Sequence, residues 1–181
     1  MTDANGCISV AIDSITQPVF LQAAASTGAI TCAGGTTTVN VTANGGTLPY
    51  TGTGTYSRFA GNYTYTVTDF NGCTASTSGI ITQPVALSAY NYPGLINCYG
   101  GTGTVIVGAS GGNTPYTGTG TYHLPAGPYN YSITDANGCI ATTSGNLTEP
   151  SLLQANATAG NITCYGGVAN VIVSATGGTP P

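Results

Sequence analysis

The sequence predicts an all-β protein made of small repeated sandwiches. Strand-forming Val, Ile, Thr and Tyr are abundant. Turns are frequent, because the 181-residue chain contains 28 glycines and 10 prolines. Charged helix-favouring residues are scarce, since Asp, Glu, Lys and Arg together make up 3% of the chain. We therefore expect almost no helix, and a period in the sequence sets the size of each sandwich.

The period is 66 residues. The motif T-D-x-N-G-C begins at positions 2, 68 and 134, which are two steps of 66. Self-similarity at a fixed step is the signature of repeat architectures. We predict the following division: the C-terminal part of a truncated repeat at 1–18, complete repeats at 19–84 and 85–150, and the N-terminal part of a truncated repeat at 151–181.

The two ends of the sequence fall inside repeats. Met1 occupies the column held by Val67 and Ile133, which are apolar strand positions. We therefore expect a slice of a longer array, with Met1 a repeat residue rather than an initiator.

Within the repeat 19–84, alternation of apolar and polar residues predicts the strands. Val39 and Val41 face inward between polar neighbours, and Tyr63, Tyr65 and Val67 form a second inward face. The predicted strands are residues 20–30, 36–42, 50–56, 63–68 and 74–82, within a total of about seven short strands, which is typical of an immunoglobulin-like sandwich.

Two turn signals complete the repeat. The Asp-x-Asn-Gly sequences predict Asx-capped hairpin turns, because Asn-Gly readily takes positive φ. A calcium loop is the alternative, although it needs several carboxylates within a dozen residues. Proline cannot continue a central ladder, so Pro18, Pro84 and Pro150 mark hinges between sandwiches that stand end to end as a stiff rod. The residues of the predicted Asp-x-Asn-Gly hairpin turns are Asp69, Asn71, Gly72, Asp135, Asn137 and Gly138.

The charge balance excludes several functions. With one basic residue, Arg58, and a net charge of −4, the chain cannot neutralise a nucleic-acid backbone. No apolar run approaches the roughly 20 residues of a membrane helix, so we expect no membrane insertion in this segment. A lone histidine, His123, gives no nucleophile–base–orienter set. We therefore expect no enzyme, catalytic residue, metal or cofactor.

The landmarks of the repeat keep a fixed order along the whole chain. Cys32-Ala33-Gly34-Gly35 is followed by residues 45–50, residues 60–73 and Gln83-Pro84. This order closely resembles the repeats of giant surface proteins of Bacteroidota, including the SprB-type repeats of gliding-motility adhesins. Many such repeats carry a tryptophan after Pro-Tyr, which this chain lacks. The resemblance implies a secreted, cell-surface fibrous protein exported by the type IX system.

Six cysteines alternate at spacings of 25 and 41 residues. In a secreted β protein this pattern favours disulfides over metal ligation, because neither C-x-x-C pairs nor further histidines exist. Immunoglobulin topology favours the pair Cys32–Cys139, which leaves the other four to residues outside this sequence. The pairs Cys32–Cys73 and Cys73–Cys98 stay open as alternatives. The six predicted disulfide cysteines are Cys7, Cys32, Cys73, Cys98, Cys139 and Cys164.

The remaining candidates lie on the predicted surface. Ser14 follows Asp13 and precedes an apolar residue, which resembles the O-glycosylation motif of Bacteroidota. Arg58 and His123 are expected in exposed loops. Tyrosines in fixed columns are expected to pack in the core and corners, with Tyr63, Tyr65, Tyr129 and Tyr131 in the core. Four tyrosines outside these columns are candidate surface contacts: Tyr90, Tyr92, Tyr99 and Tyr165.

These features predict a structural repeat section of an extracellular filament or stalk-like adhesin. Because few charges oppose side-by-side packing, we expect a homo-oligomer in which identical chains form a lateral bundle. The alternative is a carbohydrate-binding adhesin that holds surface glycans on exposed tyrosines. A third reading, ice binding by outward Thr-x-Thr runs, needs a flat ladder that a twisted sandwich does not provide.

Overall fold

The computed structural model describes residues 1–179, and this part of the chain is all-β, with strands and turns but no helix. The last two residues of the predicted final partial repeat, 180–181, lie outside it. Two compact units make up the structure. The first contains residues 1–30 and 35–82, and the second contains residues 31–34 and, of the described chain, 83–179.

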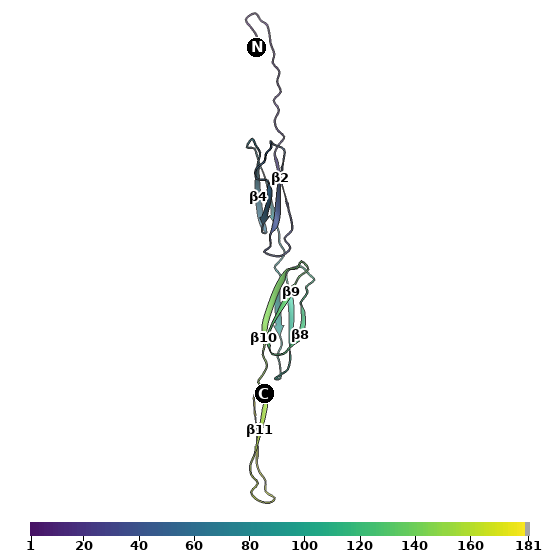
Figure 1. Ribbon diagram of the computed structural model, residues 1–181, viewed down its shortest axis with the longest axis vertical. Helices are drawn as coiled ribbons and strands as arrows, with labels where there is room; N and C mark the ends of the chain where they lie inside the picture. The colour runs from purple at the N-terminus through teal and green to yellow at the C-terminus, as the bar shows by residue number, and fades with distance from the viewer. Residues whose placement is uncertain (180–181) are drawn as a thin grey trace. The chain divides into compact units, whose positions relative to one another are not determined.

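The first unit contains a three-stranded antiparallel sheet and an antiparallel hairpin. The sheet has the order β1-β2-β3, and the hairpin pairs β4 with β5. Labels β2 and β4 mark the two sheets in Figure 1. The bounds are β1 Gln22–Thr27, β2 Thr37–Asn44, β3 Gly54–Arg58, β4 Gly61–Thr68 and β5 Thr74–Ile81.

The second unit repeats this arrangement and adds one more hairpin. Its three-stranded sheet has the order β6-β7-β8, and β9 pairs with β10 beside it (Figure 1). The bounds are β6 Ser88–Pro93, β7 Gly103–Ser110, β8 Gly120–Leu124, β9 Gly127–Thr134 and β10 Ile140–Leu147. The added hairpin pairs β11 Gln154–Ala159 with β12 Val171–Thr176. Each bound of β6 to β10 lies 66 residues after its counterpart in β1 to β5.

Alternating side chains create the core of each unit. On β2, Val39 and Val41 are buried while the residues between and beside them are exposed. They pack against Val67 of β4 and Ile81 of β5, from the facing hairpin. In the second unit the same positions are Val105, Val107, Ile133 and Leu147, which are all buried. The predicted alternation in these strands is confirmed.

The arrangement common to the two units has five strands, β1–β5 or β6–β10, and not the predicted total of about seven. The predicted strand 50–56 is wrong at its start, because β3 begins only at Gly54. Gly52 and Gly54 have φ of +84° and +140°, which interrupts extended backbone between them. Thr51 still pairs with Thr68 through two backbone hydrogen bonds, of 2.8 and 3.0 Å.

The tyrosine columns pack mostly as predicted. Tyr65 is buried, and its ring stacks on that of Tyr56, with 4.4 Å between the ring centroids. Tyr63 and Tyr129 are half-buried rather than fully in the core, and each ring lies over the glycine opposite it on the partner strand, Gly79 or Gly145. A ring over a cross-strand glycine covers backbone that would otherwise face water. Tyr131 is likewise half-buried.

We expect Ile133→Ala to lower the free energy of unfolding by about 2–5 kcal/mol, because it opens a cavity in a fully buried position. Urea denaturation measures this change. Ile140→Ala is the matched control in the same hairpin, since Ile140 is 68% exposed and its loss should change stability by less than about 0.5 kcal/mol. Equal effects of the two substitutions would contradict this core.

Candidate functional site: the cysteine-bearing turns

The T-D-x-N-G-C motif forms the turn between β4 and β5, and again between β9 and β10. In the first of these, Gly72 N donates to Asp69 O over 3.0 Å, and Asp69 N donates to Cys73 O over 2.9 Å. Only the glycine has positive φ, of +84°, and no residue other than glycine has positive φ in the described chain. The predicted hairpin is therefore present, but the reason given for it is wrong in part, because Asn71 does not adopt positive φ.

A buried carboxylate holds each turn together. Asp69 Oδ1 accepts hydrogen bonds from the amides of Asn71 and Cys73, at 3.0 and 2.8 Å. Its Oδ2 accepts from the amide of Thr47 at 2.9 Å, which ties the turn to the loop between β2 and β3. Asp135 does the same in the second unit, with Oδ2 accepting from Asn113 at 2.9 Å. The oxygens are satisfied by backbone amides, as an Asx-capped turn requires.

These amide hydrogen bonds shift the titration of the aspartates. The Thr47 amide holds the pKa of Asp69 below its ordinary value of 3.8, and the Cys73 and Asn71 amides act in the same direction against the effect of burial. The Asn113 amide likewise lowers the pKa of Asp135, with help from the Cys139 amide. The ionised form is therefore the one that the folded turn prefers.

One glycine makes room for each carboxylate. A Cβ on Gly112 would lie 2.5 Å from Asp135 Oδ2, and on Gly46 it would lie 2.7 Å from Asp69 Oδ2. Both glycines also have positive φ, of +58° and +60°. The G-G-[TN] sequence before each third strand is thus required by the aspartate that follows about 23 residues later.

The second cysteine turn, C-x-G-G, uses an acceptor that the sequence analysis missed. Gly34 N donates to Gln83 Oε1 over 2.8 Å, and Gly100 N donates to Glu149 Oε2 over 2.6 Å. Gln83 and Glu149 directly precede the predicted hinge residues Pro84 and Pro150. A side-chain oxygen that recurs 49 residues after the turn glycine in both repeats is the signal that could have found this contact.

The disulfide joins a C-x-G-G turn to a T-D-x-N-G-C turn. Cys32 bonds to Cys139 across a sequence separation of 107 residues, with 5.6 Å between the Cα atoms. Segment Thr31–Gly34 groups with the second unit accordingly. Beside the disulfide, Asn137 Nδ2 donates to Thr31 O over 3.0 Å. The alternative pair Cys32–Cys73 is contradicted, because Cys32 has another partner.

The other four cysteines are exposed thiols: Cys7, Cys73, Cys98 and Cys164. The alternative pair Cys73–Cys98 is therefore also absent. Cys73 occupies the column of Cys139, and Cys98 the column of Cys32. Asn71, the counterpart of Asn137, instead donates to Thr47 Oγ1 over 2.9 Å. The asparagine thus has a different partner in the turn that carries a free thiol.

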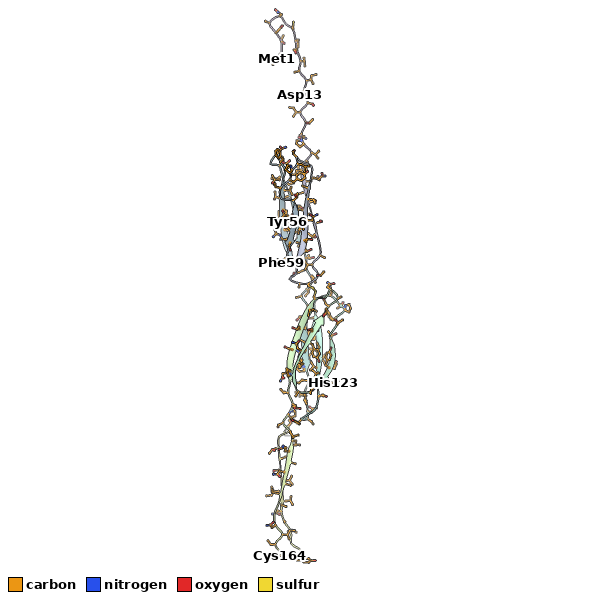
Figure 2. All side chains as sticks on the ribbon, in the orientation of Figure 1. Met1, Asp13, Tyr56, Phe59, His123 and Cys164 are labelled. Atoms are coloured by element: carbon orange, nitrogen blue, oxygen red, sulfur yellow. A yellow bond between two sulfur atoms is a disulfide. The ribbon has the colours of Figure 1, made fainter. Side chains whose placement is uncertain are left out.

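The structure places the remaining candidates outside this site. Arg58 and His123 are exposed, but they lie on strands β3 and β8, so the prediction of loops is wrong. Figure 2 labels His123. Arg58 Nε donates to Tyr65 OH over 2.8 Å, with its guanidinium 5.4 Å from that ring centroid. Ser14 is exposed, and its amide donates to Asp13 Oδ1 over 2.9 Å. All four tyrosines outside the fixed columns are exposed: Tyr90, Tyr92, Tyr99 and Tyr165.

Several tyrosine hydroxyls close the corners of the fold. Tyr116 OH donates to Gly111 O over 2.6 Å, and Tyr122 OH donates to Gly118 O over 3.2 Å. Tyr129 OH donates to Asn91 Oδ1 over 2.7 Å inside the second unit. The tyrosines at these repeated positions pack within the fold, so their rings do not form an open binding surface in every repeat.

No protein-family model matches the chain, and no curated protein matches it. Within residues 1–179, no group of three or more His, Cys, Asp or Glu side chains is arranged to hold a metal ion. The same residues include no helix that is long and apolar enough to cross a membrane. The disulfide is compatible with an extracellular, oxidising location.

We expect the fold to lose stability in acid through the aspartate turns. A folded-state pKa below the unfolded one contributes stability above pH ~4, and this contribution is lost as pH falls through the folded pKa. Thermal denaturation between pH 7 and pH 2 should therefore show a melting temperature that falls below pH ~4.

Asp135→Asn should lower the melting temperature at pH 7 and flatten this acid dependence, because the side-chain NH₂ group then faces either the Asn113 amide or both the Asn137 and Cys139 amides, from which it cannot accept hydrogen bonds. Asp13→Asn is the control, since Asp13 is exposed and should leave both quantities unchanged. An Asp135→Asn protein that keeps the full acid dependence would contradict this role of the carboxylate.

Proposed function

We propose that the chain is a structural, non-enzymatic repeat section of an extracellular filament or stalk-like surface adhesin, built from immunoglobulin-like sandwiches in tandem. The disulfide Cys32–Cys139 carries this proposal. It joins a cysteine of the repeat 19–84 to a cysteine of the repeat 85–150. A single-domain binding protein or enzyme has no need for a covalent bond of this kind between consecutive repeats.

The position of the disulfide in the sequence determines which residues of the chain carry tension. Residues 33–138 lie inside the loop that the disulfide closes. A force that pulls residue 31 away from residue 140 passes through the sulfur–sulfur bond and not through the enclosed chain. Unfolding of the enclosed residues then adds no length, which is the property that a stalk under tension requires.

The 66-residue step supports an extension of the same device. Cys98 is one step after Cys32, so its counterpart partner would be one step after Cys139. Two such loops would overlap between Cys98 and Cys139, and an array of them would leave few residues free to extend. This proposal includes the secreted, cell-surface location and type IX export that the repeat resemblance implies.

Single-molecule force spectroscopy tests the proposal directly. Stretched from its two ends, the oxidised chain should release no contour length from residues 33–138. Cys32→Ser should release it as additional unfolding steps that sum to about 350–390 Å, at about 3.3–3.6 Å for each of the roughly 107 residues.

Cys98→Ser is the matched control, because it removes an exposed free thiol from the same kind of turn. It should leave the extension of the oxidised chain unchanged. Equal contour lengths for the oxidised chain and the Cys32→Ser variant would show that the disulfide does not carry the load, and the proposed role would fail.

Lateral association with identical chains belongs to the same proposal. The supporting observation is that the exposed residues of β2, β4 and β5 in the first unit are uncharged and include Thr, Ser and Asn. Little like-charge repulsion opposes the approach of a second copy.

Sedimentation velocity should therefore show association that increases with protein concentration and changes little with salt, because screening acts on charges that this surface lacks. A monomer at the highest attainable concentration would contradict lateral bundling and leave the tension-bearing proposal to its own test.

A further inference from the structure

The second unit has an exposed aromatic surface that its counterpart in the first unit lacks. It lies on the outward face of the sheet β6-β7-β8. Tyr90 and Tyr92 of β6 are 41% and 65% exposed, and Ile106 of β7, paired with Tyr92, is 50% exposed. We call these three side chains the β6–β7 patch.

The two rings of the patch form a corner. A Cβ on Gly108 would lie 2.5 Å from Tyr90 ring carbons, so this ring lies directly over the backbone of Gly108, its cross-strand partner. The ring of Tyr92 is tilted by 59° from it, with 5.5 Å between the centroids. One ring thus forms a floor and the other a wall, and both are open to solvent.

The surroundings of the patch are polar and carry no acidic or basic side chain other than an imidazole. Thr121 pairs with Ile106, and Thr104 pairs with His123, whose Nδ1 lies 3.3 Å from Thr104 Oγ1. Figure 2 shows His123 on the second unit. Hydroxyl and imidazole groups at the rim can both donate and accept hydrogen bonds.

The backbone in the first unit is the same, but the patch is missing. Ala24 and Ser26 stand in the columns of Tyr90 and Tyr92, and Asn40 stands in that of Ile106. The strand register is the same in the two sheets. Thr42 stands in the column of Gly108, so the ring of Tyr90 covers a glycine that the first unit does not have. No such contact accounts for Tyr92, whose exposed ring beside Ile106 the fold itself does not explain.

We propose that the β6–β7 patch binds a neutral glycan, with the apolar C–H face of one sugar ring stacked on Tyr90 and its edge against Tyr92. An aromatic ring with a polar tip suits a ligand that has both apolar and hydroxyl surface. The absence of charged side chains suits a neutral ligand. A second copy of the chain is less suitable, because three side chains fall well short of the ~800 Å² per partner of a stable interface.

Nuclear magnetic resonance of protein with ¹³C-labelled tyrosine, titrated with cellohexaose and with β-1,4-mannohexaose, tests the inference. Signals of Tyr90 and Tyr92 should shift with at least one of these neutral oligosaccharides. The signal of Tyr165, which is fully exposed outside the patch, is the internal control and should not move.

Two variants place the residues of the first unit in these columns: Tyr92→Ser and Tyr90→Ala. Tyr92→Ser keeps the ring over Gly108 and should weaken binding by about tenfold, as expected for the loss of one stacking ring. Tyr90→Ala should abolish it. If Tyr90→Ala unfolds, Tyr92→Ser alone still decides the question.

Three results would overturn the inference. The first is no shift with either oligosaccharide up to its solubility limit. The second is shifts that include Tyr165, or a binding affinity that Tyr92→Ser leaves unchanged. The third is a concentration-dependent association that Tyr92→Ser removes, which would identify the patch as an interface between chains. None of these results changes the contour length released on disulfide loss, so failure here is distinct from failure of the tension-bearing role.

Discussion

The rest of the structure depends on one buried carboxylate in each repeat. Asp69 and Asp135 are each 6% exposed, and the hydrogen-bond partners of each are backbone amides from its own turn and from one neighbouring loop. The contact joins the hairpin β4–β5 or β9–β10 to the loop of the facing sheet. It also fixes the backbone of the cysteine that ends the motif, since Oδ1 of Asp135 accepts from the Cys139 amide at 2.9 Å. Two of the five acidic side chains of this chain therefore perform a structural task in these turns.

The disulfide builds on that turn. Cys139 is held by Asp135, and Cys32 lies beside a turn whose Gly34 amide is held by Gln83. Hydrogen bonds to side-chain oxygens therefore hold both of the turns that carry the two sulfurs. By chain-entropy arithmetic, closing a loop of this length contributes about 4–5 kcal/mol to stability. That is a large fraction of the ~5–15 kcal/mol that keeps an ordinary domain folded, so the disulfide is a principal element of this fold.

Much of the fold could be predicted from the sequence because the period and the alternation are local signals. Val39, Val41 and Val67 alternate with polar residues, and each is buried. The start of β3 could not be predicted from the sequence. Threonine is common in strands, so Thr51 looks like a strand residue, but the positive φ of Gly52 and Gly54 interrupts the extended backbone after it. The extent of tyrosine burial was also overestimated. Tyr63 and Tyr129 alternate like core residues, but their rings lie over glycines on the partner strand, and only the strand register reveals that pairing.

The contacts of the site differ in the same way. The Asx-capped turn was predictable, since the aspartate and the turn lie within five residues of each other. The roles of Gln83 and Glu149 were not, because each contact spans 49 residues and depends on how two loops meet. The hydrogen-bond partners of Asn71 and Asn137 could not be predicted either. The same motif makes different contacts in the turn with a disulfide and in the turn with a free thiol.

Peptide mapping of the native protein, with free thiols blocked before denaturation, tests the central pairing most directly. Cleavage before aspartate separates Cys32, in residues 13–68, from Cys73 and Cys98, in residues 69–134, and from Cys139, in residues 135–181. We expect fragment 13–68 to be joined to fragment 135–181 under non-reducing conditions, with Cys139 as the bonded residue by fragmentation. A fragment 13–68 joined to 69–134, or one that carries a blocked Cys32, would contradict the disulfide and the tension-bearing role that rests on it.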